Sequence, residues 1–289
     1  MTKRNPEYDF KWCPGCGDFG VKRAIEVSIQ QRTTEQDIPV ADNVVVAGIG
    51  CSGNMVHLIE GDQPFGFHGI HGRTLPLAFG IKMGNPNLNV LIVAGDGDFL
   101  SIGLEHIGPA AQRNLNVTAV VMDNGVYGLT KGQSSPTTDL GVITPTTPGG
   151  KVEEPVKPLE LYLAMGVTHV ASAFSSQVRE LTTMIRDAMN YPGFSIVHVQ
   201  SPCPTYNDNL DILRGNLKKD VAPKVYPISE DHDPTDISRA WDVARAPGVP
   251  IGVLYQDGVS EPLEDRVNRI VGGLRQRDSQ QILDSFEIT

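Results

Sequence analysis

Short apolar runs rich in β-branched residues recur along the chain, separated by polar turns. Because these runs are apolar throughout instead of alternating with polar residues, they are typical of strands buried on both faces of a parallel sheet. We therefore expect strands at Asn43–Ile49, Asn89–Ala94, Val117–Met122, Val167–Ala171 and Ser195–Val199.

Between these runs lie stretches in which apolar residues recur at steps of three and four, as they do on one face of a helix. We expect helices at Val21–Arg32, Ile102–Asn114 and Ser176–Met189. The alternation of strands and helices predicts an α/β fold with an open, doubly wound, mostly parallel sheet. In such sheets ligands bind at the carboxyl ends of the strands.

Two segments depart from this pattern. Gly128–Pro158 is dense in Thr, Pro, Gly and Ser, which predicts a long ordered loop. After Cys203 the periodicity weakens, and we expect an extended arm over Asn207–Asp236 and a partly helical tail from Ile237 onward. We therefore expect a domain at residues 1–206. The C-terminal arm and tail at 207–289 are expected to pack on the same domain or on a partner subunit.

Bulk properties narrow the class of protein. A formal net charge of −10 over 289 residues argues against nucleic acid as a partner, because such binding needs clustered Lys and Arg. No apolar run approaches the length of a membrane span, and Met1–Phe10 lacks the apolar core of a signal peptide. The cytoplasm is therefore the expected compartment.

The chain has four cysteines. Cys13 and Cys16 form a Cys-Pro-Gly-Cys turn before the first expected helix, and Cys51 and Cys203 follow the first and last expected strands. Since parallel strands end on one edge of a sheet, these thiolates can meet there. Four thiolates suit either a tetrahedral zinc ion or a 4Fe-4S cluster, and spacing alone does not separate the two. Buried, unligated cysteines are a third interpretation.

Polar residues also follow two consecutive expected strands, as Gly95-Asp96-Gly97-Asp98 and Asp123-Asn124-Gly125-Val126. A carboxylate, a side-chain amide oxygen and a backbone carbonyl suit Mg²⁺, whose remaining positions would go to diphosphate oxygens and water. The glycines allow the backbone to approach the phosphates. Simpler interpretations are a helix N-cap for Asp96 or Asp98 and a turn residue for Asn124.

Gly-Asp-Gly at a strand end, followed at this interval by Asn after the next strand, is the thiamine diphosphate motif. The chain as a whole resembles the β subunits of two-subunit 2-oxoacid:ferredoxin oxidoreductases, of the 2-oxoglutarate:ferredoxin oxidoreductase kind. The resemblance runs in order from Trp12 to Asn207 and continues weakly to Tyr255. It is carried by five segments: Trp12-Cys-Pro-Gly-Cys-Gly-Asp-Phe-Gly20, Gly48-Ile-Gly-Cys-Ser52, His71-Gly-Arg-Thr74, Asp123-Asn-Gly-Val-Tyr-Gly-Leu-Thr-Lys-Gly-Gln-Ser-Ser-Pro-Thr-Thr138 and Ser201-Pro-Cys-Pro-Thr205.

The resemblance implies a sheet of the thiamine-diphosphate-binding type. It makes Asp96, Asn124 and the backbone carbonyl of Val126 the magnesium ligands. It also implies that the walls around thiamine diphosphate are formed by Ile49, Gly50, Cys51, Ser52, His71, Gly72, Gly97, Asp98, Gly128 and Leu129. One departure is Asn124-Gly125, where many thiamine enzymes have Asn-Asn, but no Mg²⁺ ligand is lost by it.

For the cysteines, a thiamine site on the same sheet edge favours the 4Fe-4S cluster, because the resembling enzymes must remove electrons singly and zinc cannot. The implied reaction is the coenzyme A-dependent oxidative decarboxylation of a 2-oxoacid, with 2-oxoglutarate as the best guess. Electrons pass from thiamine diphosphate through the cluster to ferredoxin, and the reaction is reversible. The alternatives are a non-oxidative thiamine-dependent decarboxylase subunit with a structural zinc, and a non-catalytic metal- and nucleotide-binding scaffold.

Thiamine enzymes activate the cofactor with a Glu on a pyrimidine-binding domain, and this chain has room for one thiamine-type domain only. We therefore expect that Glu on a partner α subunit, in an (αβ)2 heterotetramer. The resemblance gives Lys131 a coenzyme A role, although a solvated loop lysine is the simpler interpretation. His71 and Arg73 flank a glycine before an expected helix near Pro76, where a cation could stand at the active-site edge.

Overall fold

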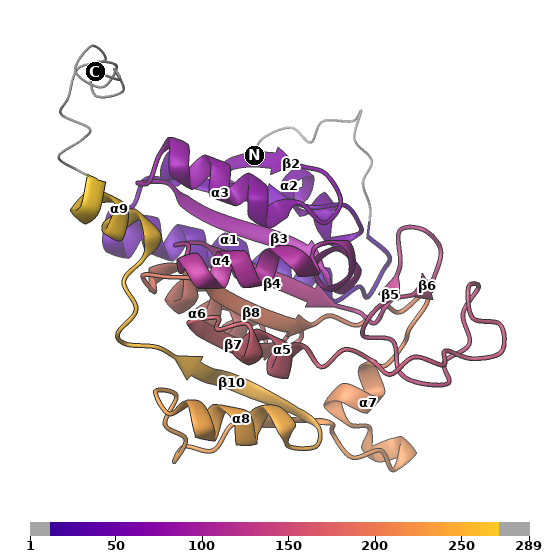
Figure 1. Ribbon diagram of the computed structural model, residues 1–289. Coiled ribbons are helices and arrows are strands. Elements are labelled where there is room, and N and C mark those ends of the chain that lie inside the picture. Colours follow the sequence, from indigo (N-terminus) through magenta and orange to yellow (C-terminus); the bar gives the residue numbers. More distant parts are fainter. Residues whose placement is uncertain (1–11, 272–289) are drawn as a thin grey trace, which may run out of the picture.

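The computed structural model of the chain describes residues 12–271, so Met1–Phe10 and the end of the predicted tail lie outside the described residues. Its centre is an eight-stranded sheet in the order β2-β1-β3-β4-β8-β7-β10-β9 (Figure 1). The strands are β1 Asn43–Ala47, β2 Phe65–His68, β3 Asn89–Gly95, β4 Thr118–Asp123, β7 His169–Phe174, β8 Ser195–Gln200, β9 Val225–Pro227 and β10 Val249–Gln256. All neighbouring pairs run parallel except β10 with β7, which confirms the predicted open, mostly parallel α/β sheet.

The five strands expected from apolar runs are present as β1, β3, β4, β7 and β8, and every residue of β1, β4 and β7 is buried. Two bounds differ for local reasons. The first strand stops at Ala47 because the N–H of Ile49 donates to the Asp98 carboxylate, 3.0 Å away, instead of to the sheet. The β7 strand starts at His169 because the Val167 N–H donates to the Tyr162 carbonyl and closes a turn.

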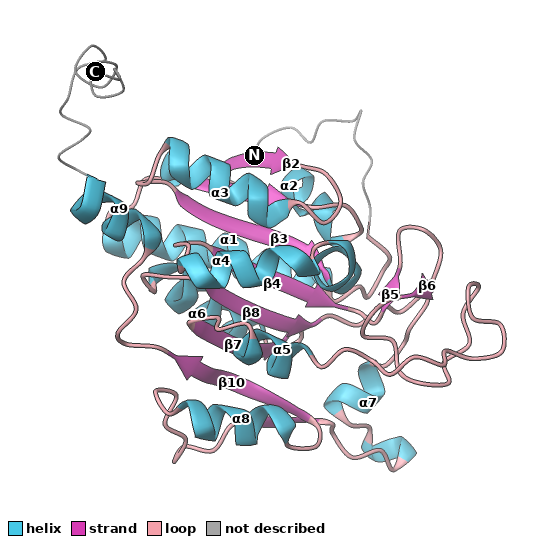
Figure 2. Cartoon of the chain, in the orientation of Figure 1, coloured by secondary structure: helices cyan, strands magenta, loops and turns pink. Residues whose placement is uncertain are grey.

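Helices cover both faces of the sheet (Figure 2). The helices are α1 Asp18–Gln36, α2 Met55–Leu58, α3 Thr74–Gly84, α4 Ile107–Arg113, α5 Pro158–Ala164, α6 Val178–Asn190, α7 Leu210–Arg214, α8 Ile237–Arg245 and α9 Leu263–Val271. Short 3₁₀ turns lie at Val40–Asp42, Ser52–Asn54, Leu104–His106 and Leu217–Lys219. Among the described residues, 12–271, no helix is both long and apolar enough to cross a membrane.

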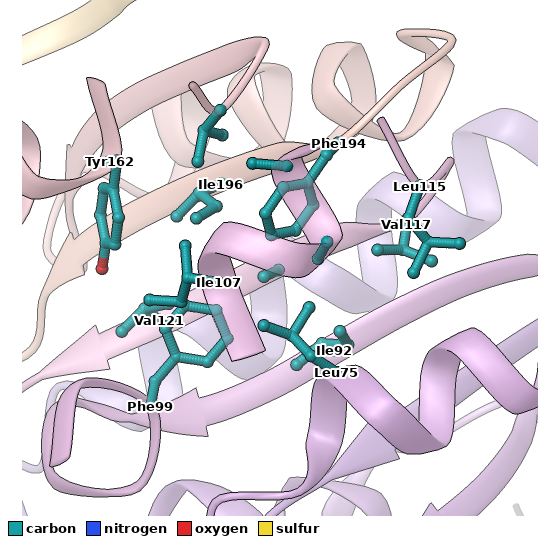
Figure 3. Packing of buried hydrophobic residues seen from close by; sticks show 14 of the residues in the cluster. Leu75, Ile92, Phe99, Ile107, Leu115, Val117, Val121, Tyr162, Phe194 and Ile196 are labelled. Carbon is teal, nitrogen blue, oxygen red and sulfur yellow. The ribbon is translucent and has the colours of Figure 1, made fainter. Parts of the chain in front are cut away.

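Each face of the sheet has its own apolar core. On one face α1 and α6 pack against each other and against alternate residues of the central strands. On the other face α3, α4 and α5 contribute Leu75, Ile107 and Tyr162, which pack against Ile92 and Ile196 of the sheet (Figure 3). Because both faces are covered, the strand ends at the carboxyl edge are the part of the sheet open to a ligand.

The helix predicted at Ile102–Asn114 is interrupted. Residues Asp98–Ile102 form a wide π-helical turn, the 3₁₀ turn at Leu104–His106 follows, and α4 begins only at Ile107. A Cβ added at Gly103 would lie 2.6 Å from the Asp98 carbonyl oxygen, so the backbone passes this point closely. π-Helical turns occur often at functional sites, and this one follows directly on the Gly-Asp-Gly segment.

The long loop predicted at Gly128–Pro158 is present but ends at Lys157, because Pro158 begins α5. Its one strand is β6 Gln133–Ser134, which pairs with β5 Val126–Tyr127. The C-terminal part is more integrated than the sequence indicated. Strand β10 pairs with β7 inside the main sheet, and α8 packs over it, so the segment expected as a partly helical tail supplies part of the sheet.

Candidate functional site

A pocket of about 200 Å³ opens at the carboxyl edge of the sheet. Its lining includes Asp96, which follows β3, and Asn124 and Val126, which follow β4. Most of the predicted cofactor wall lines it too: Ile49, Gly50, Cys51, Ser52, His71, Gly97, Asp98, Gly128 and Leu129. Of the predicted wall, Gly72 alone is not part of the lining of this pocket, and its N–H donates to Asp98 at 2.8 Å. Residues from four strand ends thus meet around one hollow.

Asp98 holds two sides of this pocket together. Its buried Oδ1 accepts hydrogen bonds from the N–H groups of Ile49 at 3.0 Å and Gly72 at 2.8 Å, and lies 2.5 Å from His71 Nδ1. These partners come from the loops after β1 and β2. The interpretation of Asp98 as a helix cap is therefore wrong, because the following turn has no side-chain cap and the carboxylate is used elsewhere.

Asp96 is almost fully buried, and its Oδ2 accepts a hydrogen bond from the Thr137 hydroxyl at 2.7 Å. Burial raises the pKa of Asp96 to about 7, and the nearby charge of Asp123 acts in the same direction. A second buried carboxylate beside the first is costly without a compensating cation. Asn124 Oδ1 accepts from the Val126 N–H at 3.0 Å, so the predicted turn at Asn124 is also present.

These residues fit a magnesium ion. Asp96, Asn124 and Val126 offer oxygen atoms of the kind that Mg²⁺ prefers, and all three line the same pocket. A divalent cation would also compensate the paired charges of Asp96 and Asp123. Gly97 keeps the pocket narrow, since a Cβ there would come within 2.3 Å of the Tyr127 ring.

Tyr127 lines the pocket and its hydroxyl donates to the Gly97 carbonyl at 3.1 Å, although the sequence did not single it out. Lys131 lies just beyond the pocket-lining Thr130, is exposed, and has a φ of 84°. A non-glycine residue in this region is strained, and such strain often occurs where a side chain must be placed for function. Arg73 is not in the pocket lining, and it donates to the Ile102 carbonyl at 2.6 Å and pairs with Glu105 at 3.5 Å.

The four cysteines come from three segments that hydrogen bonds hold side by side. The Cys16 N–H donates to the Cys13 carbonyl at 3.0 Å, closing the Cys-x-x-Cys turn with Gly15 at a φ of 82°. The Trp12 indole N–H donates to the Cys51 carbonyl at 2.8 Å. The N–H of Gly17 donates to the carbonyl of Pro202, next to Cys203, at 3.0 Å. The turn, the end of β1 and the end of β8 therefore meet.

Gly128 lies close to two of the sulfur atoms. A Cβ added there would be 3.4 Å from Cys51 Sγ and 3.9 Å from Cys203 Sγ. Burial, followed by the charge of Asp18, raises the pKa of Cys51 to about 12 and also raises the pKa of Cys16. Thiolates in such surroundings are stabilised by a bound metal, so the donor set fits an iron–sulfur cluster chemically. As they stand, residues 12–271 contain no group of three or more His, Cys, Asp or Glu side chains that could hold a metal ion.

Asp18 is a further buried residue beside the cysteines that the sequence did not single out. Its Oδ1 accepts from the Ser201 hydroxyl at 2.6 Å, and burial raises the pKa of this carboxyl to about 6. An acidic residue at the first turn of α1 looks like an ordinary helix-start residue in sequence. The burial of Asp18 becomes evident only in the structure, where Ser201, after β8, packs against it.

Two family models match consecutive parts of the chain. Residues 48–199 match the family of thiamine pyrophosphate enzymes, C-terminal TPP binding domain. Residues 203–271 match the family described as the C-terminal part of the pyruvate ferredoxin oxidoreductase beta subunit. The fold is therefore that of a thiamine diphosphate-binding domain.

Relatives extend the likeness to nearly the whole chain. The 2-oxoacid:ferredoxin oxidoreductase 2 subunit beta of Aeropyrum pernix is 34% identical over 276 residues, which cover 91% of this chain and 85% of that protein. A 2-oxoglutarate synthase subunit of Archaeoglobus fulgidus is 39% identical over 228 residues, covering 78% and 82%. The structure of 2-oxoglutarate:ferredoxin oxidoreductase from Magnetococcus marinus, with 2-oxoglutarate, coenzyme A and succinyl-CoA bound, superposes with a TM-score of 0.87 at 35% identity, covering 100% of this chain and 98% of that one.

The chain belongs to the β subunits of the 2-oxoacid:ferredoxin oxidoreductases, which confirms the family indicated by the sequence motifs. It is thus one subunit of an enzyme and implies a partner α subunit.

Proposed function

We propose that this β subunit, together with its α subunit, catalyses the coenzyme A-dependent oxidative decarboxylation of 2-oxoglutarate. Electrons leave through a 4Fe-4S cluster to ferredoxin, the reaction is reversible, and the enzyme is cytoplasmic. The observation that carries the proposal is the position of Cys51, which lines the pocket with Asp96 and Asn124 and has its sulfur beside Gly128 with that of Cys203. Cys51 thus belongs both to the wall of the proposed diphosphate pocket and to the proposed set of cluster ligands.

In this proposal Mg²⁺ is held by Asp96, Asn124 and the backbone carbonyl of Val126, and it binds the diphosphate. Thiamine diphosphate, when bound, supplies the carbanion that attacks the 2-oxoacid and stores electrons as CO₂ leaves. Asp98 orients His71 and holds the loops after β1 and β2, which keeps the pocket formed before the cofactor arrives. The close contact of Gly97 with Tyr127 limits the space left for water.

Cys13, Cys16, Cys51 and Cys203 are the proposed cluster ligands. Their role is to keep a one-electron acceptor next to the cofactor pocket, and the shared position of Cys51 makes that path short. Four cysteines in the chain leave none for a second cluster of this kind.

For the substrates, support comes from relatives. The similar Magnetococcus marinus enzyme has 2-oxoglutarate, coenzyme A and succinyl-CoA bound, and the Archaeoglobus fulgidus relative is a 2-oxoglutarate synthase subunit. Lys131, strained and exposed just beyond the pocket, is the proposed contact for coenzyme A. His71 faces the pocket as a second polar contact, and Arg73 acts at its edge if the partner subunit frees it from Glu105.

The α subunit would supply the pyrimidine-binding half of the site and the activating Glu, in an (αβ)2 heterotetramer. Within this chain we assign residues 1–206 to the thiamine diphosphate-binding domain and 207–289 to a C-terminal part that packs on it or on the partner. The pairing of β10 with β7 favours packing on the same domain.

The deciding experiment is purification of the αβ complex without oxygen, followed by measurement of iron, acid-labile sulfide, zinc, magnesium and thiamine diphosphate. We expect about four iron atoms, one magnesium ion and one thiamine diphosphate per β chain. Turnover is then compared for 2-oxoglutarate, pyruvate, branched and aryl 2-oxoacids with coenzyme A and an artificial electron acceptor. Zinc without iron would favour a non-oxidative decarboxylase, and a lack of bound thiamine diphosphate would favour a non-catalytic scaffold.

A further inference from the structure

Behind the proposed magnesium ligand Asp96, a threonine hydroxyl joins two carboxylates. Thr137 Oγ1 lies 2.7 Å from Asp96 Oδ2 and 2.7 Å from Asp123 Oδ1. Thr137 belongs to the long loop after β5, far in sequence from both acids. Because a hydroxyl has a single hydrogen, it can donate to only one carboxylate at a time, so Asp96 and Asp123 are alternative acceptors for Thr137.

Asp123 stands next to Asn124 in the diphosphate motif, yet its own oxygens are already used. Oδ1 accepts from the Gly125 N–H at 3.0 Å and contacts Thr137, and Oδ2 lies 3.0 Å from His198 Nε2. Both oxygens of Asp123 thus have partners, and Asp123, unlike Asp96, does not line the pocket, so it is not placed as a ligand of a metal ion there. It serves as a fixed anchor instead.

The anchor continues deeper into the protein. A carboxylate only accepts, so His198 Nε2 carries the hydrogen toward Asp123, and in the neutral ring Nδ1 accepts from the Tyr162 hydroxyl at 3.1 Å. His198 is on β8, Tyr162 is on α5, and both are buried. The direction of each hydrogen bond is thus set from Tyr162 outward to Asp123.

The loop around Thr137 is fixed as well. The neighbouring Thr138 hydroxyl donates to the Gly125 carbonyl at 2.6 Å, and the buried Lys151 ammonium donates to the Thr138 carbonyl at 2.7 Å. These bonds place the 137–138 turn against the ends of β3 and β4 independently of Asp96. Thr137 therefore contacts Asp96 from a position that the rest of the loop determines.

We propose that Thr137 is a positioning residue for the magnesium site: the fixed 137–138 turn places its hydroxyl, which donates to the Asp96 carboxylate from behind, with Asp123, anchored by His198, as the alternative acceptor. This inference rests on the proposed role of Asp96 as a magnesium ligand. Preorganisation of this kind strengthens metal binding, because a ligand already held in place loses less freedom when the ion arrives. The loop that carries Lys131 is, by the same contact, tied to the metal site.

The test is the Mg²⁺ affinity of the purified αβ complex, measured by titration calorimetry after chelation, with thiamine diphosphate in excess. Thr137→Val removes the hydroxyl and keeps the shape, and it should weaken Mg²⁺ binding about tenfold or more, the loss expected for a hydrogen bond to a charged group. Thr137→Ser keeps the hydroxyl and should bind within about threefold of wild type. If Thr137 contributed only packing, Thr137→Ser, which loses the methyl group, would weaken Mg²⁺ binding more than Thr137→Val. The opposite order is therefore expected only if the hydroxyl positions Asp96.

Thr146→Val is the matched control, because its hydroxyl bonds to Ser134 and Thr144 within the same loop and not to Asp96. It should leave the Mg²⁺ affinity unchanged. If Thr137→Val does not fold by circular dichroism, Thr137→Ala carries the same expectation. An unchanged Mg²⁺ affinity in whichever of these folds would overturn the inference.

Asp96→Asn distinguishes a failure of the positioning role of Thr137 from a failure of the proposed magnesium site. If it abolishes Mg²⁺ binding while Thr137→Val does not affect it, the positioning role fails and the magnesium role of Asp96 stands. If Asp96→Asn binds Mg²⁺ and thiamine diphosphate like wild type, the proposed magnesium site itself is wrong, and the positioning role falls with it.

Discussion

His71 Nδ1 lies 2.5 Å from Asp98 Oδ1, and the two residues join the loop after β2 to the turn after β3. The same oxygen also accepts two backbone N–H groups, so one carboxylate joins the loops after β1 and β2 to the turn after β3. The contact orients the His71 ring, which lines the pocket. The shape of the pocket should therefore depend on the charge of Asp98.

Asp98→Asn keeps the size of the side chain but removes its charge, so its hydrogen bonds to Ile49, Gly72 and His71 weaken. We expect the affinity for thiamine diphosphate to fall about tenfold, as for the loss of one charge-assisted hydrogen bond. Calorimetric titration of the αβ complex measures this. The exposed Asp62→Asn is the control and should bind like wild type. Equal affinity of Asp98→Asn and Asp62→Asn would contradict the role of Asp98.

Cys51→Ser tests the cluster. A cube has no substitute ligand when one thiolate is lost, so the variant complex should lose its iron–sulfur absorption and its reduction of ferredoxin. Thiamine diphosphate should still bind, if more weakly, because Asp96, Asn124 and Val126 are intact and Cys51 forms part of the wall. Absorption spectra, iron content and cofactor content are measured together. One zinc and no iron per β chain in the wild-type complex would refute the oxidoreductase proposal.

Lys131→Ala should raise the apparent KM for coenzyme A about tenfold to a hundredfold, the range for an interaction with a charged group. Slow decarboxylation without coenzyme A should remain. Lys131→Gly makes a useful partner variant, because glycine adopts the φ of 84° without strain. It should lose the same affinity and yet melt at least as high as Lys131→Ala. An unchanged KM in both would return Lys131 to the role of a solvated loop residue.

The isolated chain should have no turnover on any 2-oxoacid, because the activating Glu is expected on the α subunit. Steady-state assays with and without added α subunit check this directly. Adding α subunit that lacks its own activating Glu should not restore turnover. Decarboxylation by the β chain alone at the rate of the complex would show that the division between subunits is drawn wrongly.

The lowered pKa of His169 predicts that the free energy of unfolding falls in acid. His169 is buried, and burial lowers its pKa to about 4 from the ordinary 6.5. The unfolded chain therefore takes up a proton below pH 6.5 that the folded chain resists until about pH 4. The stabilisation is fully present above pH 6.5 and is lost as the pH falls through that window, by about 2 kcal/mol at pH 5.

Urea unfolding of the chain at about pH 7.5 and about pH 5 measures this effect, with His169→Asn as the comparison. The variant starts from a lower free energy of unfolding but should lose less of it between the two pH values. If both proteins lose the same amount, His169 does not account for the acid sensitivity.

The sequence predicts the central sheet well and its edges poorly, for a physical reason. Strands β1, β3, β4, β7 and β8 are covered on both faces, so burial imposes a continuous apolar run that can be read directly. Strand β2 is an edge strand with every residue exposed. In β10, Pro250 and Gly252 break the apolar run that would identify a strand in the sequence. Its antiparallel pairing with β7 is a long-range contact, which no local sequence pattern predicts.

The site divides in the same way. Asp96, Asn124 and the glycines are recognisable because they follow predicted strands, and the structure gathers them around one pocket. Thr137, Asp123 and His198 were not assigned, since a threonine in a loop and a histidine inside an apolar strand have many ordinary roles. Their meaning appears only when the long loop folds back on the ends of β3 and β4.

The position of β8 between β4 and β7 has a consequence for how the protein is made. Strand β7 is synthesised before β8 but cannot pair with β4, so the sheet stays in two parts until Ser195–Gln200 leaves the ribosome. At ordinary rates of synthesis this interval is on the order of ten seconds, during which the free edge of β4 is exposed to wrong partners. Cys203 follows directly after β8. The fourth thiolate therefore emerges together with the strand that closes the sheet, and we expect cluster assembly to await completion of the central fold.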